Sequence, residues 1–454
     1  MKKLNYFLLA LMAFSVLSLN SCGSDDETDD PDGSITFEEA TTAFANYFDT
    51  AGNTVTDPAF EALSIKPTAD LGTTSAPPAA MENAAYKGAI DPDGATPWYA
   101  GWSFYSRLVA GNMNSDPLAI TTAETITDDG SGTGTVTWSN DKTYVLDGFV
   151  FVNEGQTLTI EPGTIIQGMS GEAEEASALI VARGGKIIAE GTATDPIVFT
   201  FDGDAGNTPA TTRGQWGGLI ILGNAGLNSN PGETAIEGIP TTETRGLYGG
   251  DDNSDDSGIL KYVSIRHGGT LIGGDNEING LTLGGVGSGT TIEYVEVVGN
   301  QDDGIEWFGG TVQGNHLITA FCADDGLDYD EGYRGWNQFC IIHQDPADAG
   351  SGGEHDGGTD PEAATPFATP LFYNVTSIGA ELKQALNFRD NAGGEYHNSI
   401  FTGYATGVDV ELLESEQDSY KQFEDGNLKL ENNVFHDITA GTDGAAIFVV
   451  RQSE

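Results

Sequence analysis

Two short stretches of the chain carry the same cluster of carboxylates in the same order. Residues 300–309 read NQDDGIEWFG, and residues 322–332 read CADDGLDYDEG. The first aspartates of the two clusters, Asp302 and Asp324, are 22 positions apart. If the fold brings the two copies together, the paired acids have the chemistry to hold a hard cation or to act as acid and base in hydrolysis.

The first alternative is a Ca²⁺ site, because clustered carboxylates and turn carbonyls suit a hard cation that takes oxygen ligands. Like charges on neighbouring strands repel each other unless a cation lies between them. Between residues 292 and 345 the only lysine or arginine is Arg334. No organic cofactor is expected. The candidate Ca²⁺ ligands are Asp302, Asp303, Glu306, Asp324, Asp325 and Asp328.

The second alternative is catalysis on a polysaccharide by a hydrolase or a lyase. Hydrolysis by two carboxyl groups needs them roughly 5 to 9.5 Å apart, and adjacent strands can supply that separation. A histidine on the next strand could assist proton transfer. The candidate catalytic residues are Asp302, Asp303, Asp324, Asp325 and His343. The third alternative is structural, with aspartates that accept hydrogen bonds from backbone N–H groups in turns.

The elements around these turns are short strands. From Val136 onward, β-branched runs of strand length alternate with Gly, Asn and Asp, and no helix-length amphipathic segment interrupts them. Alignment at 22 residues places Val295, Leu317 and Phe339 in one apolar column. A parallel β-helix stacks equivalent positions about 4.8 Å apart, so a period near 22 favours one turn of such a helix.

The spacing also bears on the cysteines. In this register Cys340 lies over Ile318, and Cys322 is four residues further along its own turn. Four residues of strand span about 13 Å, too far for a disulfide bond. We therefore expect two free thiols.

Composition supports a repeat fold that displays negative charge. Glycine accounts for 62 of 454 residues, which suits a turn-rich all-β chain. The formal net charge of −51 makes nucleic acid an unsuitable partner, because both surfaces are negative.

The N-terminus reads as a targeting segment. Residues 1–21 have a basic start and a short apolar stretch, which is typical of a signal peptide. Cys22 lies at the expected cleavage point of a bacterial lipoprotein, where the cysteine carries the lipid. Residues 22–35 then form an acidic tether, in which residues 23–34 have no apolar content. We expect a lipid-anchored protein of the outer membrane, exposed at the cell surface.

The region between the tether and the strands is expected to be a small helical and irregular segment, residues 36–135. An amphipathic helix is predicted from residue 35 to about 50. Further along, this segment contains six aromatic residues that could bind sugar, although packing against the neighbouring domain is the favoured interpretation. They are Tyr86, Trp98, Tyr99, Trp102, Phe104 and Tyr105.

Five longer stretches resemble the β-helix lipoproteins common in Bacteroidetes. They are residues 85–105, 137–168, 213–225, 259–269 and 276–297. The acidic run after Cys22 also resembles the surface-export signal of Bacteroidetes lipoproteins. The resemblance implies a pectate-lyase-like fold and a surface location. It implies no settled reaction and carries over no catalytic residues.

The sequence as a whole predicts an all-β chain, a right-handed single-stranded parallel β-helix over residues 136–454. Its main predicted function is a surface-exposed binding or structural module, stabilised by Ca²⁺, whose partner is an extracellular polysaccharide. The competing prediction is a polysaccharide-degrading enzyme that uses the acidic turns. Four aromatic residues are predicted to stack on sugar rings. They are Trp307, Tyr329, Tyr333 and Trp336.

Overall fold

A computed structural model describes residues 35–452, except residues 63, 114–115, 273–277, 359–360 and 414–416. The chain divides into two units, Met1–Thr36 and Phe37–Glu454. The predicted signal peptide, Cys22 and all but the last residue of the tether lie outside the described residues. In the part of the chain that the structure describes, no helix has the length and apolar composition needed to cross a bilayer.

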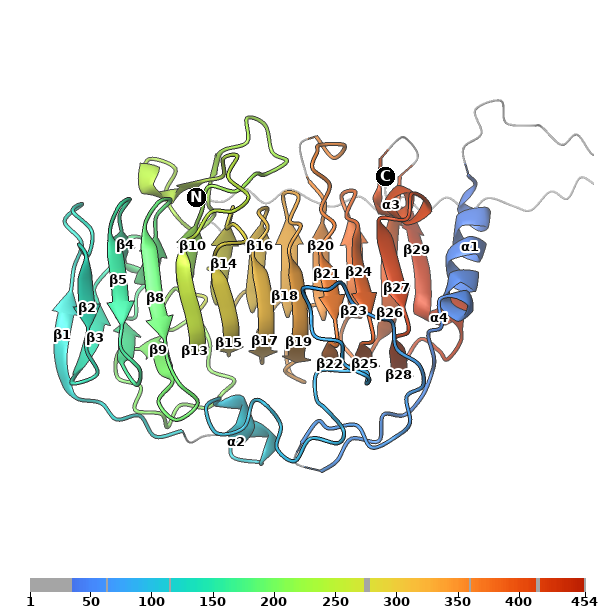
Figure 1. The fold of residues 1–454 in the computed structure, drawn as a ribbon, viewed down its shortest axis with the longest axis horizontal. Coiled ribbons are helices and arrows are strands. Elements are labelled where there is room, and N and C mark those ends of the chain that lie inside the picture. The colour runs from blue at the N-terminus through green and yellow to red at the C-terminus, as the bar shows by residue number, and fades with distance from the viewer. Residues whose placement is uncertain are drawn as a thin grey trace, which may run out of the picture. The chain divides into compact units, whose positions relative to one another are not determined.

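Residues 122–452 form a right-handed parallel β-helix, the fold class that the sequence predicts (Figure 1). Its strands form a 17-stranded sheet and a 10-stranded sheet, and the pairings within both sheets are parallel. The 17-stranded sheet bends along a line into two rows of strands, which we call ladder 1 and ladder 2. The 10-stranded sheet is ladder 3. Each complete turn contributes one segment to each ladder.

The strand bounds follow this order. Ladder 1 contains β2 (Val136–Trp138), β5 (Thr157–Ile160), β8 (Lys186–Glu190), β21 (Leu371–Tyr373), β24 (Gly394–His397) and β27 (Leu428–Glu431). Ladder 2 contains β1 (Thr122–Ile126), β3 (Lys142–Leu146), β6 (Ile165–Gly168), β9 (Ile197–Phe201), β22 (Thr376–Ile378), β25 (Ile400–Tyr404) and β28 (Val434–Ile438). Four long strands run through both ladders: β13 (Gly258–Arg266), β15 (Thr291–Val298), β17 (Gln313–Ala320) and β19 (Trp336–His343).

Ladder 3 and the remaining elements complete the unit. Ladder 3 contains β4 (Phe149–Val152), β7 (Ala178–Val181), β10 (Leu219–Leu222), β14 (Leu281–Gly284), β16 (Ile305–Phe308), β18 (Leu327–Asp330), β20 (Gly353–Asp356), β23 (Gln384–Arg389), β26 (Thr406–Leu412) and β29 (Phe448–Gln452). The other elements are β11 (Thr234–Ala235), β12 (Leu247–Tyr248), α1 (Phe37–Thr50), α2 (Tyr105–Val109), α3 (Ser419–Glu424), α4 (Gly444–Ile447), η1 (Ala173–Glu175) and η2 (Thr244–Gly246).

The predicted period of 22 residues holds for one turn and is wrong for the next. Val295 pairs with Leu317, as expected. Leu317 then pairs with Cys340 rather than with Phe339. The turn after β18 is one residue longer than the turn after β16, and this shifts the register by one position. Cys340 is therefore next to Leu317 and not over Ile318.

The cysteines are free thiols, as predicted. Cys322 and Cys340 are both buried and unpaired. Burial raises the pKa of the Cys322 thiol to about 11 and that of Cys340 further. Neither thiol is therefore ionised at neutral pH.

The line between ladders 1 and 2, which we call the bend, has an unusual backbone. From β13 onward, one residue of each turn there has a positive φ, between 52° and 60°, and none of these residues is glycine. The last three positions of this column are asparagines, which tolerate a positive φ better than most residues. The column runs Tyr262, Tyr294, His316, Phe339, Asn374, Asn398 and Asn432. The first rings stack directly, with Tyr262 and Tyr294 4.5 Å apart and Tyr294 and His316 4.4 Å apart.

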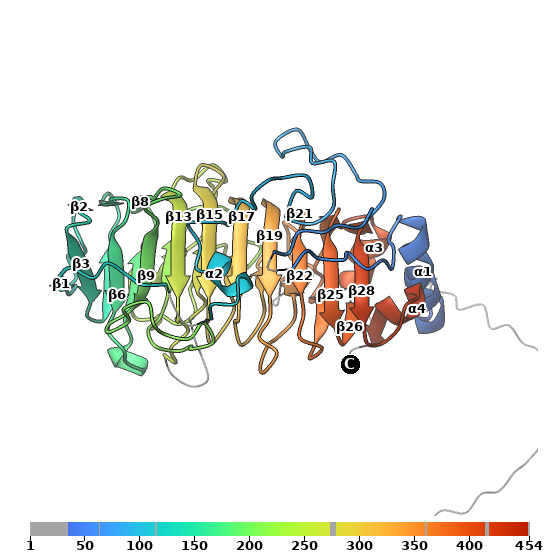
Figure 2. The same ribbon diagram turned by 90° about the horizontal axis from the view of Figure 1, so that it is seen from below.

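The segment before the β-helix packs along the bend (Figure 2). Its aromatic residues, including Trp98 and Trp102, pack on Tyr294, so the packing interpretation is confirmed. The main chain is also attached, since Asn374 donates to the carbonyl of Tyr86 at 2.7 Å. The segment then enters the first strand, β1, which pairs with β3.

Helix α1 forms where the sequence predicts it and packs on the last turn of the β-helix. Its buried residues, Ala40, Phe44 and Phe48, are four positions apart and form one apolar face. The ring of Phe44 stacks on Phe448 of β29 at 4.9 Å. In Figures 1 and 2, α1 lies beside α4 at the end of the stack. It shields apolar side chains that a following turn would otherwise cover.

Candidate functional site

The outward-facing side chains of ladder 3 form a row of acids. Because side chains alternate along a strand, Ile305 and Trp307 of β16 point into the β-helix and Glu306 points out. Glu306 pairs with Asp328 of β18, as the sequence predicts, and Asp328 pairs with Glu354 of β20. We call this row the acidic column. It comprises Glu306, Asp328, Glu354 and Asp409, with Asn387 before Asp409.

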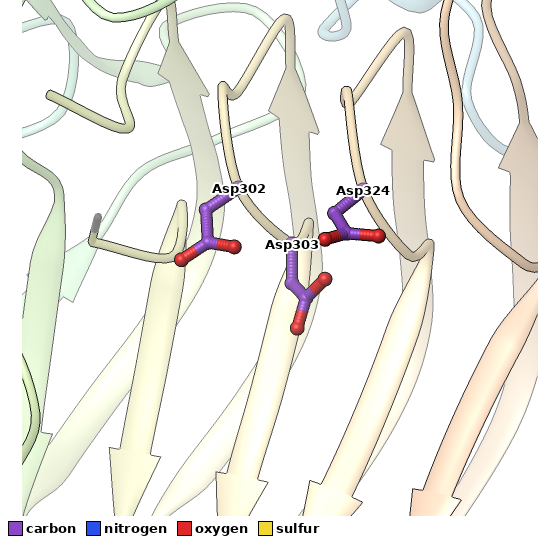
Figure 3. Close-up of side chains that lie close together, drawn as sticks. All are labelled: Asp302, Asp303 and Asp324. Carbon is purple, nitrogen blue, oxygen red and sulfur yellow. The ribbon is translucent and has the colours of Figure 1, made fainter. Parts of the chain in front are cut away.

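The doubled Asp-Asp turns lie at the entrance to these strands (Figure 3). The predicted neighbours do come together. One carboxylate oxygen from each of Asp302, Asp303 and Asp324 lies within 4.8 Å of the other two. A second group with the same spacing contains Asp303, Asp325 and Asp328. Asp303 belongs to both groups and joins the turn to the acidic column.

The turn aspartates also have the structural role that the third alternative describes. Asp303 accepts a hydrogen bond from the backbone N–H of Asp325 at 2.8 Å. Asp325 in turn accepts one from the backbone N–H of Ser351 on the following turn. These bonds tie successive turns together, but they use only part of the capacity of each carboxylate, which has about four acceptor positions.

Burial and mutual repulsion make ionisation of these acids costly. Asp303 is 6% exposed, Asp325 is 4% exposed and Glu306 is 8% exposed. Burial, followed by the charge of neighbouring carboxylates, raises the pKa values of Asp303, Glu306, Asp325 and Asp328 well above the ordinary range. Burial and the neighbouring acids raise the pKa of Asp330 to about 7. At neutral pH the cluster therefore needs protons or cations to persist.

Basic side chains compensate only one end of the acidic column. Arg389 pairs with Glu354 at 2.5 Å and with Asp356 at 2.7 Å. Arg334 bonds instead to the carbonyl of Gly332 and to Asn253. In the described part of the chain, neither lysine nor arginine forms an ion pair with four acids at the other end of the column and in the adjoining turns. These are Asp303, Glu306, Asp325 and Asp328.

The donor set fits a hard divalent cation. Oδ1 of Asp328 is buried and has no hydrogen-bond partner among the described residues, and Asp328 belongs to the second carboxylate group. A buried charged oxygen without a partner is energetically costly, and a bound cation would remove that cost. Carboxylate oxygens from adjacent turns, with backbone carbonyls and water, are the usual ligands of Ca²⁺.

Comparison with known proteins identifies the family of the chain. Residues 130–453 match the family described as the pectate-lyase-like β-helix domain. The chain belongs to this family. The match includes every strand of ladder 3 and all the acids described above.

Other comparisons add little to the pectate-lyase-like β-helix. One solved structure that is similar is the catalytic domain of Agl-KA, with 11% sequence identity and a TM-score of 0.30. The similarity covers 75% of this chain and 68% of that chain. An overlap of this quality supports no statement about activity. No curated protein sequence matches the chain.

Three of the four residues predicted to stack on sugar rings are buried, because their side chains point into the pectate-lyase-like β-helix. Trp307 is 1% exposed, and Tyr329 and Tyr333 are fully buried. Trp307 and Tyr329 alternate with the outward-facing acids and therefore fill the interior. Tyr333 follows β18, and Trp307 stacks on its ring at 5.2 Å. The prediction is wrong for these three residues, because a buried ring has no face for a sugar. Trp336 is half-buried, and its role stays a prediction.

His343 does not lie with the acids, in contrast to the prediction. Its Nδ1 lies 3.0 Å from the hydroxyl of Tyr105, and its ring stacks on Phe321. Burial lowers the pKa of His343 to about 4, so the ring is neutral at pH 7. Its described contacts place it in the packing between ladder 2 and the N-terminal segment, which contradicts its predicted role in catalysis.

The acidic face of the pectate-lyase-like β-helix extends further than the sequence suggested. Glu354 and Asp356 flank His355 in β20, in the same acid–aromatic–acid order as Asp328 and Asp330 flank Tyr329. This order of residue types is the sequence signal that could have predicted the extension of the acidic face to β20. It was missed because the spacing from β18 to β20 departs from 22 residues.

Proposed function

We propose that the chain is a Ca²⁺-binding β-helix that acts as a binding or structural module at the cell surface. The observation that carries the proposal is the group formed by Asp303, Asp325 and Asp328. These carboxylates are within 4.8 Å of one another, lack a basic partner among the described residues, and include the unpartnered Oδ1 of Asp328. Glu306 forms no ion pair with a lysine or arginine among the described residues, and it borders the group through its pairing with Asp328.

Glu306 extends this group along the acidic column. It faces Asp328 across the two strands and accepts a hydrogen bond from the amide of Asn279. Asn279 is an uncharged partner, so it leaves the charge of Glu306 in place. A cation held at Asp303, Asp325 and Asp328 would therefore also lower the cost of ionising Glu306.

The partner that fits this face is an extracellular polysaccharide, held through the cation. The buried rings of Trp307, Tyr329 and Tyr333 remove the predicted stacking surface. A cation whose ligands on one side come from the protein can take its remaining oxygen ligands from sugar hydroxyl or carboxylate groups. An acidic glycan would otherwise be repelled by a chain with a net charge of −51.

The location belongs to the same proposal. Cys22 at the end of a signal-peptide-like segment supports a lipid anchor in the outer membrane, and the acidic run after it supports export to the cell surface. Cys22→Ser should release the chain from the membrane fraction of cells, while Ser24→Ala should leave it there. If the Cys22→Ser chain stays in that fraction, the lipid anchor is wrong.

Asp328→Asn and Asp325→Asn should change Ca²⁺ affinity and metal-free stability in opposite directions. Each variant removes a negative charge at nearly constant shape, so it should weaken Ca²⁺ binding in calorimetry by at least about tenfold, the equivalent of about 1.4 kcal/mol. Without metal, the same variants should melt at a higher temperature, because they relieve repulsion between buried acids. For the unaltered chain, Ca²⁺ at 100 times its Kd should add about 2.7 kcal/mol of stability.

The matched control is Glu154→Gln, which removes one exposed acid from the turn between β4 and β5. It should leave both Ca²⁺ affinity and melting temperature close to those of the unaltered chain. If Asp328→Asn binds Ca²⁺ as tightly as the unaltered chain, the proposed site is wrong.

The raised pKa of Asp330, about 7, favours a second candidate function. A partly buried carboxyl that holds its proton near neutral pH is suited to general acid catalysis, so a polysaccharide-degrading enzyme remains the competing proposal. The carboxylate oxygens of Asp303, Asp325 and Asp328 are closer than the roughly 6.5–9.5 Å that inverting hydrolases use. New reducing ends from a polysaccharide, formed by the unaltered chain and lost in Asp328→Asn, would replace the binding role with an enzymatic one.

A further inference from the structure

A pocket of about 170 Å³ lies between the N-terminal segment and the bend, apart from the acidic column of ladder 3. The N-terminal segment contributes Tyr86 and Trp98 to its lining, and the bend contributes His316 and Phe339. Two acids, Glu82 and Asp91, also line it. We call this site the aromatic pocket. The proposed Ca²⁺ site does not involve it, and the wall from the N-terminal segment lies outside the residues that match the family.

The rings of the aromatic pocket are held in fixed positions by neighbouring contacts. Trp98 meets the ring of His316 edge-on, with centroids 4.8 Å apart and an angle of 82°. Tyr86 lies nearly parallel to Phe339, with centroids 6.2 Å apart. Behind Phe339, the ring of His316 is 4.9 Å away. Because these rings already pack on one another, a ligand would not need to order them.

Hydrogen bonds also fix the main chain around the aromatic pocket. Nε1 of Trp98 donates to the carbonyl of Ala89 at 2.9 Å. Glu82 donates its N–H to the side chain of Gln338 at 2.9 Å, and its carbonyl accepts from the same side chain at 2.7 Å. The carboxylate of Glu82 is left exposed at the pocket. The indole N–H of Trp98 is already used, so this ring offers its π surface and not a donor.

The charges and dipoles around the aromatic pocket favour a cation. Glu82 and Asp91 are exposed acids, and among the described residues that line the pocket none is a lysine or an arginine. The ammonium of Lys66 reaches the carbonyl of Gly94 at the pocket, but it also pairs with Glu61 at 3.6 Å. The faces of aromatic rings are electrically negative and attract cations. Burial lowers the pKa of His316 to about 4, so its ring adds no positive charge at pH 7. Nδ1 of His316 is buried and has no hydrogen-bond partner among the described residues.

The volume limits the size of the ligand. A cavity of roughly 150 Å³ holds one benzene molecule, and drug-sized ligands occupy roughly 300–1,000 Å³. At about 170 Å³, the aromatic pocket has room for an alkylated ammonium group and a short substituent. We propose that the aromatic pocket binds the ammonium group of a small organic cation. Trp98 and Tyr86 would contact the cation with their rings, and the carboxylates of Glu82 and Asp91 would attract its positive charge.

Choline is a suitable probe, because 3,3-dimethyl-1-butanol has the same shape without the charge. Calorimetry with the full chain should show saturable choline binding and at least about tenfold weaker binding of the neutral alcohol, since aromatic cages select for charge. Trp98→Ala should weaken choline binding by about tenfold, and Trp98→Phe should restore part of it, because Phe keeps a π face.

Glu82→Gln and Asp91→Asn test the charge without disturbing the fold, because both side chains are exposed. Each should weaken choline binding by about threefold, as expected for an exposed charge near a ligand. The matched control is Asp93→Asn, an exposed acid two residues from Asp91 that does not line the pocket. It should leave choline affinity unchanged.

Four results would overturn the proposal. The first is no choline binding by the folded, unaltered chain. The second is equal affinity for choline and 3,3-dimethyl-1-butanol, which would make the aromatic pocket a general apolar cavity. The third is choline binding that neither Trp98→Ala nor Glu82→Gln weakens, which would place the cation elsewhere. Binding of methyl glucoside in place of choline would count against the proposal in the same way and indicate a sugar site.

Discussion

Without divalent cations, the chain is expected to lose stability as the pH rises from about 4 to about 8. The pKa values of Asp303, Glu306, Asp325 and Asp328 are raised by burial and by neighbouring acids. At a pH below the pKa values that these carboxyls have in the unfolded chain, they are protonated in both the folded and the unfolded state. They then do not lower the free energy of unfolding. Above those pKa values, the unfolded chain releases protons that the folded chain retains, so unfolding becomes more favourable until the folded pKa is passed.

The effect should be large. Asp330 alone, with a pKa raised from 3.8 to about 7, should cost on the order of a few kcal/mol at pH 8, since each pKa unit corresponds to about 1.36 kcal/mol. Urea unfolding of the full chain in a chelator, at a series of pH values, measures this slope. Excess Ca²⁺ should restore stability most strongly at pH 8, where the acids are most ready to ionise.

Two kinds of variant distinguish the effect of the acid cluster on the pH dependence of stability from the effect of the overall charge of the chain. Asp325→Asn and Asp328→Asn together should flatten the pH dependence, whereas Glu154→Gln should leave it nearly unchanged. If the stability of the metal-free chain instead rises from pH 4 to pH 8, its buried acids are already compensated and the Ca²⁺ proposal loses its physical basis.

Phe44→Ala is expected to destabilise the chain by about 3–5 kcal/mol, the usual cost of truncating a buried phenylalanine. Phe44 is fully buried in α1. Its ring lies 4.9 Å from Phe448 and 5.1 Å from Phe423, on the last turn of the β-helix. Truncation should leave a cavity between helix and stack. The free energy of unfolding in urea measures the loss.

Phe37→Ala in the same helix is the matched control, because Phe37 is 43% exposed. Its effect should stay within about 0.5 kcal/mol, as for most surface substitutions. Equal small effects for both variants would mean that α1 does not pack on β29 in solution.

The fold could be predicted because its signals are local and repeated. Short β-branched runs, turn residues and the doubled acidic turn all indicated stacked strands, and α1 showed clear helical spacing. The pairing of Glu306 with Asp328 followed directly from the period. The register failed one turn later, because a single extra residue between β18 and β19 shifts every following pair.

The site was harder to predict because side-chain direction depends on that register. In β16 and β18, acids and aromatic residues alternate, so one set faces outward and the other fills the core. The sequence shows the alternation, but both sets suit a carbohydrate site by residue type. The packing shows which set faces outward. Trp307 and Tyr329 are buried, whereas Glu306 and Asp328 face outward. The aromatic pocket could not be predicted, because its two walls are more than 200 positions apart.

The contact between α1 and β29 also constrains the order of events during synthesis. Successive turns can pair as soon as the next strand is available, because each contacts mainly its neighbours. Phe44 cannot reach its place until Phe448 has been made. Helix α1, the first helix of the described chain to leave the ribosome, is therefore among the last elements to be packed, and until then its apolar face needs protection from other chains.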